Sequence, residues 1–161
     1  MNVNLDTTLL DGLIVGRVDP HIYAFTTGTI PNYLKVGDTY RPVNVRLNEW
    51  RVHYKDLEPV YDHIAKVDNG NIFRDYAVHY FLEHDKNLKR LKEDVFADEY
   101  YSREFFEAAT PNDVDEAIAD ICRSARENDG KYRLYSPDLL PVVYKLSLIH
   151  ISEPTRQAEI S

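Results

Sequence analysis

Residues 21–39 decide the fold, and they read HIYAFTTGTIPNYLKVGDT. Residues 21–26 and 33–36 are short runs rich in aromatic and β-branched side chains, a composition typical of strands. The intervening residues 27–32 include Gly and Pro, which favour a turn. We therefore predict two antiparallel strands that form a hairpin with a longer loop.

Beyond the hairpin the hydrophobic pattern changes to a helical period. Val43, Leu47 and Trp50 fall at i, i+4 and i+7 and predict a helix within 39–50, with Pro42 in its first turn. The remaining expected elements are a third strand within 57–67, a helix from 73 to about 87 with its apolar face centred near Tyr80, an extended aromatic segment at 100–106, and a helix that begins at Thr110-Pro111 and ends near Gly130. This order predicts an α/β (α+β) fold: a small, three-stranded, mainly antiparallel sheet flanked by helices.

We divide the chain into a lead-in (1–19), one domain (20–128), an extended exit segment (129–145) and a tail (146–161). The tail reads LSLIHISEPTRQAEIS, and its first eleven letters agree with the translation of a transposase-type sequencing adapter. We therefore interpret the tail as non-native, exclude it from the fold, and expect the natural protein to continue past Lys145.

Composition limits the class of protein. The chain has 161 residues and a net charge of −8, and its single cysteine, Cys122, excludes a disulfide framework and a cysteine-based zinc site. No apolar run approaches the roughly 18 residues of a membrane span, and the first residues do not resemble a signal peptide. We expect a cytoplasmic protein of bacterial or phage origin. The acidic charge argues against a free-standing nucleic-acid binder, so another domain is expected to supply most of the DNA affinity.

Four residues on the two strands and the first helix form the densest group of reactive side chains. Arg46 is able to clamp phosphate oxygens at two points, and Lys35 to stabilise negative charge. Tyr23 is able to take or relay a proton if a nearby cation lowers its pKa, and Gly37 permits close approach of backbone or substrate. Each also has a structural interpretation: packed aromatic, edge lysine, helix-surface arginine and turn glycine.

The order of these residues resembles the GIY-YIG nuclease superfamily. His21-Ile22-Tyr23 corresponds to its Gly-Ile-Tyr motif, and Lys35-Val36-Gly37 to its Tyr-Ile-Gly motif, in the form of a branch that has Lys-Ile-Gly. Arg46 corresponds to the helix arginine of the family. Two later segments also resemble that branch: residues 75–82, which match Glu-x-x-x-His-x-x-Leu with Asp75 in place of Glu, and Glu104-Phe105-Phe106.

The resemblance implies a DNA endonuclease domain that depends on Mg²⁺ (or Mn²⁺). It also implies that this domain forms the N-terminal part of a larger helicase- or restriction-type protein, with DNA as partner and a fused, helicase-like downstream domain. The site residues that it implies are Tyr23, Lys35, Arg46 and His79 for catalysis, Gly37, Thr39 and Arg41 for substrate binding, and Asp75 for the metal, with Glu83 and Glu104 as substitutes.

Two alternatives stay open on the sequence alone. One is a catalytically inactive module of the same fold that binds DNA or a protein. The other is an acidic adaptor that uses exposed aromatic side chains as a contact patch. These would be Tyr100, Tyr101, Phe105 and Phe106.

Overall fold

The computed structural model describes residues 19–91 and 103–139. Its elements are β1 (His21–Thr26), β2 (Tyr33–Thr39), α2 (Val43–Trp50), β3 (Glu58–Ile64), α3 (Asp75–His84), β4 (Phe105–Glu107), α4 (Pro111–Glu127) and the short 3₁₀ helix η4 (Pro137–Leu139). The strands form one antiparallel sheet in the order β3-β1-β2-β4. The predicted α+β class is therefore confirmed, and most of the lead-in and the whole tail lie outside the described residues.

The predicted hairpin of β1 and β2 forms the centre of the sheet. Its register pairs His21 with Thr39 and Tyr23 with Gly37. The second strand extends to Thr39, beyond the predicted end at Val36, because the β1 ladder continues through Gly37. Gly37 is thus a strand residue, and because it has no side chain it leaves space opposite Tyr23.

The sheet has four strands, and the prediction of three was wrong. The additional strand, β4, pairs Phe105 with Lys35 and Glu107 with Tyr33. It comprises only three residues, and its partner lies about seventy positions earlier in the chain. A strand this short has no periodic pattern of its own, so only the tertiary pairing reveals it.

The helices α2 and α3 are shorter than the segments in which their hydrophobic patterns predicted a helix. The helix α4 is close to its predicted range. The expected capping box is present in α4, because the Thr110 side chain accepts from the Asp113 N–H and the Asp113 side chain accepts from the Thr110 N–H. Pro111 occupies the first turn, and the helix ends at Glu127, followed by Asn128 in the left-handed conformation. In contrast, the N-cap residues of α2 and α3, Pro42 and Arg74, make no side-chain hydrogen bond to their helices.

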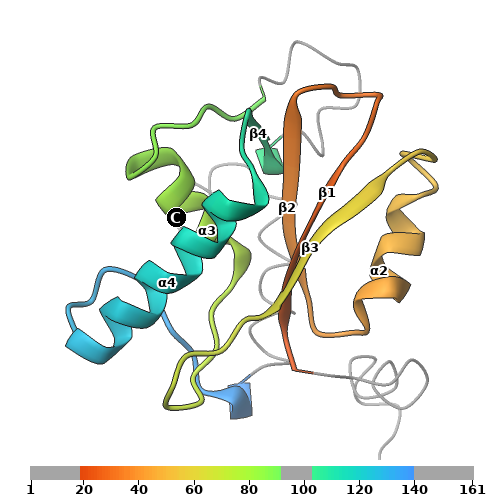
Figure 1. Cartoon of the computed structure of the whole chain (residues 1–161). Coiled ribbons are helices and arrows are strands. Elements are labelled where there is room, and N and C mark those ends of the chain that lie inside the picture. Colours follow the sequence, from red (N-terminus) through yellow and green to blue (C-terminus); the bar gives the residue numbers. More distant parts are fainter. Residues whose placement is uncertain (1–18, 92–102, 140–161) are drawn as a thin grey trace, which may run out of the picture.

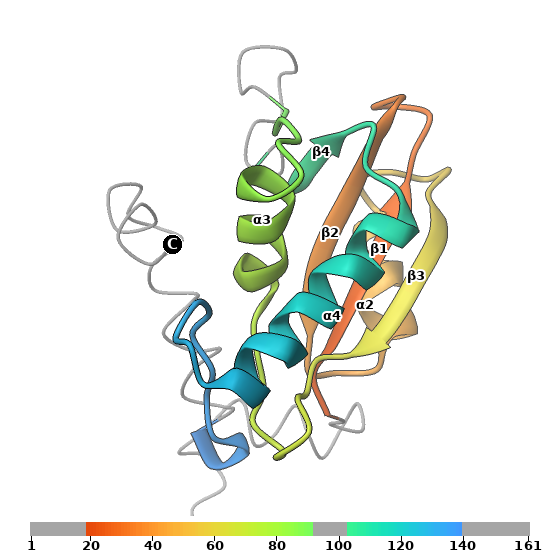
Figure 2. The same cartoon turned by 60° about the vertical axis from the view of Figure 1, so that its left-hand side comes forward.

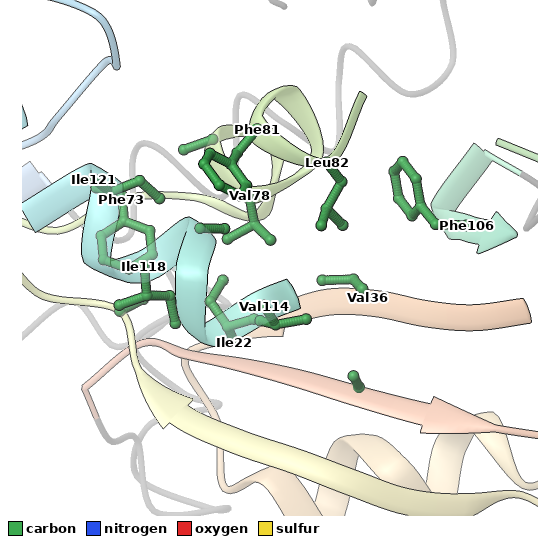
Figure 3. Packing of buried hydrophobic residues seen from close by; sticks show 14 of the residues in the cluster. Ile22, Val36, Phe73, Val78, Phe81, Leu82, Phe106, Val114, Ile118 and Ile121 are labelled. Carbon is green, nitrogen blue, oxygen red and sulfur yellow. The ribbon is translucent and has the colours of Figure 1, made fainter. Parts of the chain in front are cut away.

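Helices cover both faces of the sheet. Figure 1 shows α3 and α4 on one side and α2 on the other, and the turned view in Figure 2 places α3 along the free part of the β2 edge. The core between the sheet, α3 and α4 is aliphatic and phenyl (Figure 3), and it includes Ile22, Val36, Phe73, Val78, Phe81, Leu82, Phe106, Val114, Ile118 and Ile121. The core under α2 is aromatic, and it includes Tyr23, Phe25, Leu47, Trp50, Tyr54 and Phe105.

The exposed aromatic patch of the adaptor alternative is contradicted in its described part. Phe105 and Phe106 are both 0% exposed and belong to the two cores. They are buried because β4 is a strand of the sheet, so its successive side chains point to opposite covered faces. Tyr100 and Tyr101 lie outside the described residues. Within the described ranges, no helix is both long and apolar enough to cross a membrane.

Candidate functional site

Tyr23 and Lys35 meet above Gly37 on the α2 face of the sheet. A Cβ atom on Gly37 would lie 2.7 Å from the Lys35 Nζ and 2.7 Å from the Tyr23 hydroxyl oxygen. Both side chains are almost fully buried. The space opposite Tyr23 is therefore filled by the two polar groups themselves, and glycine is required because any side chain would displace them.

The indole of Trp50 holds this group together. Its Nε1–H donates to the Tyr23 hydroxyl at 2.6 Å. The Lys35 Nζ lies 4.2 Å from the centre of the Trp50 ring, and the Arg46 guanidinium carbon lies 4.9 Å from it. Two cations on one indole are a cation–π arrangement that orients both of them toward the same phenol. We call Tyr23, Lys35, Arg46 and Trp50 the Tyr23 cluster.

Arg46 extends the Tyr23 cluster toward the surface. Its positive charge acts on the Tyr23 hydroxyl, and it donates a hydrogen bond to Glu49 at 2.9 Å. The Arg46 side chain is 34% exposed, so part of its guanidinium faces solvent. Glu49 also accepts two bonds from Arg41, at 2.7 and 2.8 Å. Glu49 thus binds Arg46, which was predicted for catalysis, and Arg41, which was predicted for substrate binding.

Lys35 has a carboxylate partner, Glu104, just before β4. Its Nζ donates to the Glu104 Oε1, and the Glu104 side chain is 35% exposed. Burial alone would lower the pKa of Lys35, but the charge of Glu104 raises it above its ordinary value. Burial would raise the pKa of Glu104, yet the charge of Lys35 and its hydrogen bond hold it below its ordinary value. Both groups are therefore charged at neutral pH.

The condition under which Tyr23 would take a proton, a pKa lowered by a nearby cation, is not met. Burial raises the pKa of Tyr23, and the opposing effects of Lys35 and Arg46 are smaller. A buried phenolate would lose its hydration, and that cost exceeds the attraction of the two cations here. Tyr23 is consequently a neutral phenol at pH 7 and a hydrogen-bond donor rather than a phenolate base.

Asp75, the metal ligand implied by the resemblance, lies at the start of α3 against β2. Its backbone N–H donates to Asp38 at 2.9 Å, and Asp38 also accepts from Arg74 at 2.6 and 3.2 Å. Burial, with the nearby charges of Asp38 and Glu104, raises the pKa of Asp75 well above its ordinary value. In contrast, Arg74 outweighs burial and holds the pKa of Asp38 below its ordinary value. The charges of Glu104 and Lys35 therefore both act on the Asp75 carboxyl, in opposite directions.

His79 is buried between α3 and β2. Its Nε2 lies 2.8 Å from the carbonyl oxygen of Val36, just beyond the last β2 residue that pairs with β4. Burial, with the positive charge of Arg90, lowers the pKa of His79 to about 3. The neutral ring therefore donates Nε2–H to Val36, so it completes the hydrogen bonding of the β2 edge where β4 ends. This geometry gives His79 a positioning role at neutral pH in place of proton transfer.

The remaining predicted residues are engaged elsewhere. The Thr39 hydroxyl lies in the turn toward α2, where it accepts from the Arg41 N–H at 3.1 Å. Glu83 pairs with Arg90 at 2.8 Å. Among residues 19–91 and 103–139, no set of three His, Cys, Asp or Glu side chains is placed to hold a metal ion. Mg²⁺ often binds through one or two carboxylates with waters and substrate phosphate, and Glu104, ionised and partly exposed, fits that mode best.

Sequence reasoning missed three residues that build the site. Trp50 was assigned only to the helix core, although its place four residues after Arg46 puts both on one face of α2. Glu49 pairs with Arg46 at the i, i+3 spacing, which is a readable signal. Asp38 directly follows the Lys35-Val36-Gly37 motif, but its pairing with Arg74, which is 36 positions away, gave no signal.

Comparison with known proteins adds no relative. No protein-family model matches the chain, and no curated protein or solved structure matches it significantly.

Proposed function

We propose that this chain carries a metal-dependent DNA endonuclease domain of the GIY-YIG type, which hydrolyses phosphodiester bonds. The observation that supports it best is the convergence of Tyr23, Lys35 and Arg46 on Trp50, in a space that only Gly37 leaves open. These residues come from both strands of the hairpin and from α2, in the order of the family motifs. A structural core has no need to bury a lysine and a phenol hydroxyl together.

The charges in the cluster match the demands of phosphodiester hydrolysis. The exposed part of Arg46 binds two phosphate oxygens, and Lys35 adds positive charge beside them. Tyr23 stays neutral and donates its proton in a hydrogen bond to the phosphate or to the departing oxygen. Glu104 stays ionised and accepts a proton from the attacking water, or binds the metal.

Glu104 is the residue that would hold Mg²⁺ (or Mn²⁺), with Asp75 next to it. Held there, the ion would supply positive charge at the phosphate and would lower the pKa of a water molecule bound to it. Asp75 carries a raised pKa, so it joins as a ligand only after losing its proton. Lys35 donates to the same carboxylate, so a metal ion would share Glu104 with it.

The test is cleavage of plasmid and branched DNA by the full chain with Mg²⁺. We expect nicking that chelation abolishes, and at least a hundredfold loss in Arg46→Ala and Tyr23→Phe, on the scale that catalytic hydrogen-bond donors contribute. Arg126→Ala on α4 is the matched control, because that side chain is 58% exposed and should leave cleavage unchanged. Absence of metal-dependent cleavage on every DNA form would refute the proposal.

Gly37→Ala tests the geometry more directly. The new methyl group would displace the Tyr23 hydroxyl and the Lys35 amine, so we expect cleavage to fall with Arg46 untouched. Gly28→Ala is the control, since a Cβ there would approach Asp56 just as closely, at 2.7 Å. Asp56 is exposed and moves aside, so this variant should retain full activity.

A catalytically inactive DNA-binding module is the second candidate. The closed Lys35–Glu104 pair favours it, because the carboxylate that suits a metal is already neutralised. This alternative predicts that Arg46→Ala weakens DNA binding while wild type cleaves nothing. Measuring both binding and cleavage on the same variants separates the two candidates.

A further inference from the structure

A hollow of about 410 Å³ lies on the α2 face of the sheet, beside the Tyr23 cluster. Its floor comes from β1 and β3, and its wall from the start of α2. The lining residues are His21, Pro42, Val43, Asn44, Leu47 and Asp62. This volume falls within the range of about 300–1,000 Å³ of small-molecule sites.

The strand register makes the hollow a neighbour of the Tyr23 cluster. Side chains alternate along a strand, so His21 and Tyr23 lie on one face of β1, about 6.8 Å apart. Asp62 pairs directly with Tyr23 across β1 and β3. On the helix side, Arg46 comes three residues after Val43, a spacing that makes the two side chains neighbours on the surface of α2. A molecule with its phosphate at Arg46 is therefore placed beside the Val43 wall of the hollow.

The lining suits an uncharged ring with polar edges rather than a second phosphate. Pro42, Val43 and Leu47 provide apolar walls, and the Asn44 amide provides a donor and an acceptor. His21 is oriented by a 2.5 Å contact between its Nδ1 and Asp62. The carboxylate of Asp62 repels anions, whereas Arg46 and Lys35 next door attract them.

We propose that this hollow holds the nucleoside adjacent to the phosphate bound at Arg46, with its base against Val43 and Leu47 and its polar edge toward Asn44 and His21. The proposal depends on the proposed function for the phosphate half of the site. It adds that a single nucleotide unit is recognised by its base and sugar as well as by its phosphate.

The test compares thymidine monophosphate with inorganic phosphate as ligands of the full chain, followed by NMR. We expect both ligands to shift the Arg46 side-chain signals, and only the nucleotide to shift the Val43 and Leu47 methyl groups. The nucleotide should bind at least about tenfold more tightly than phosphate. Equal affinities, or nucleotide shifts confined to Arg46, would overturn the proposal.

Two tryptophan substitutions make the test specific. Val43→Trp fills the hollow and should remove the affinity advantage of the nucleotide while phosphate affinity persists. Val52→Trp adds the same side chain at a site that is 74% exposed, and should change neither affinity. Nucleotide binding in the hollow without DNA cleavage would contradict the nuclease proposal alone. DNA cleavage by both wild type and Val43→Trp, with equal nucleotide affinity, would contradict the nucleoside site alone.

Discussion

The two faces of the sheet bury side chains of opposite character. Leu34 and Lys35 are adjacent on β2, and both are at most 1% exposed. Leu34 packs among aliphatic and phenyl groups under α3 and α4, whereas Lys35 lies between Trp50 and Glu104 under α2. The same strand therefore contributes to an apolar core on one face and to a charged cluster on the other.

This difference implies that the two faces contribute differently to the stability of the fold and to its chemistry. Apolar burial is favourable in proportion to the area removed from water. A buried lysine is costly unless a carboxylate and an aromatic ring compensate it. The α3–α4 face is thus expected to hold the fold together, and the α2 face to retain polar groups because they act on a ligand.

The largest effect is expected where a buried ion pair lies at the edge of the apolar face. Asp38→Ala removes the carboxylate from Arg74 and the acceptor from the Asp75 N–H, and both Arg74 and Asp38 side chains are nearly buried. We expect unfolding free energy to fall by about 3–5 kcal/mol, the range for breaking a buried pair from one side. Urea denaturation measures this change.

Arg126→Ala is the control for that substitution. It breaks a 3.2 Å contact with Asp68 on the surface, where both partners are mostly exposed. The expected loss is below about 1 kcal/mol, as for exposed ion pairs generally. Equal losses in the two variants would show that the Asp38–Arg74 pair contributes no more than a surface pair does.

The adjacent residues Leu34 and Lys35 provide the direct test of the two faces. Leu34→Ala should lower the unfolding free energy by about 2–4 kcal/mol through the cavity it leaves, with DNA binding or cleavage per folded molecule unchanged. Lys35→Met should show the reverse, because methionine retains the apolar stem and water reaches the partly exposed Glu104. The measurements are urea midpoints and DNA assays on both variants. A Lys35→Met variant that is stable and fully active would contradict the assignment of chemistry to the α2 face.

Sequence patterns correctly predicted the features that depend on residues close together in the chain. The β1–β2 hairpin follows from its aromatic and β-branched runs, and the α4 capping box from Thr110, Pro111 and Asp113. The group of Tyr23, Gly37, Lys35 and Arg46 also followed from the sequence. Its members lie on three consecutive elements, so short connections keep them together.

Long-range contacts were not predictable in the same way. Glu104 is 69 positions from Lys35, and no periodicity indicates that the two meet. The apolar face of α3 was placed near Tyr80, yet Tyr80 is partly exposed while Asp75 and His79 are buried. Polar residues normally mark the solvent side of a helix. Here they face the β2 edge, where backbone and side-chain partners accept them.

The smallest expected effect concerns that edge and depends on pH. His79 has a folded pKa of about 3, below its ordinary value of 6.5, so the unfolded chain binds the proton first as pH falls. The stability from neutral His79 is fully present above pH 6.5 and is lost as pH falls, by at most about 2 kcal/mol between pH 6.5 and 5 at about 1.4 kcal/mol per pH unit. His79→Gln keeps a donor for Val36 without titrating, so the stability of this variant should fall less than that of the wild type between pH 6.5 and 5.

Asp75, with its raised pKa, acts in the opposite direction, since stability from its protonated form is lost as pH rises. It is present in both proteins, and the difference between their urea midpoints therefore reports His79. Parallel pH profiles would show that His79 is not held neutral at the β2 edge.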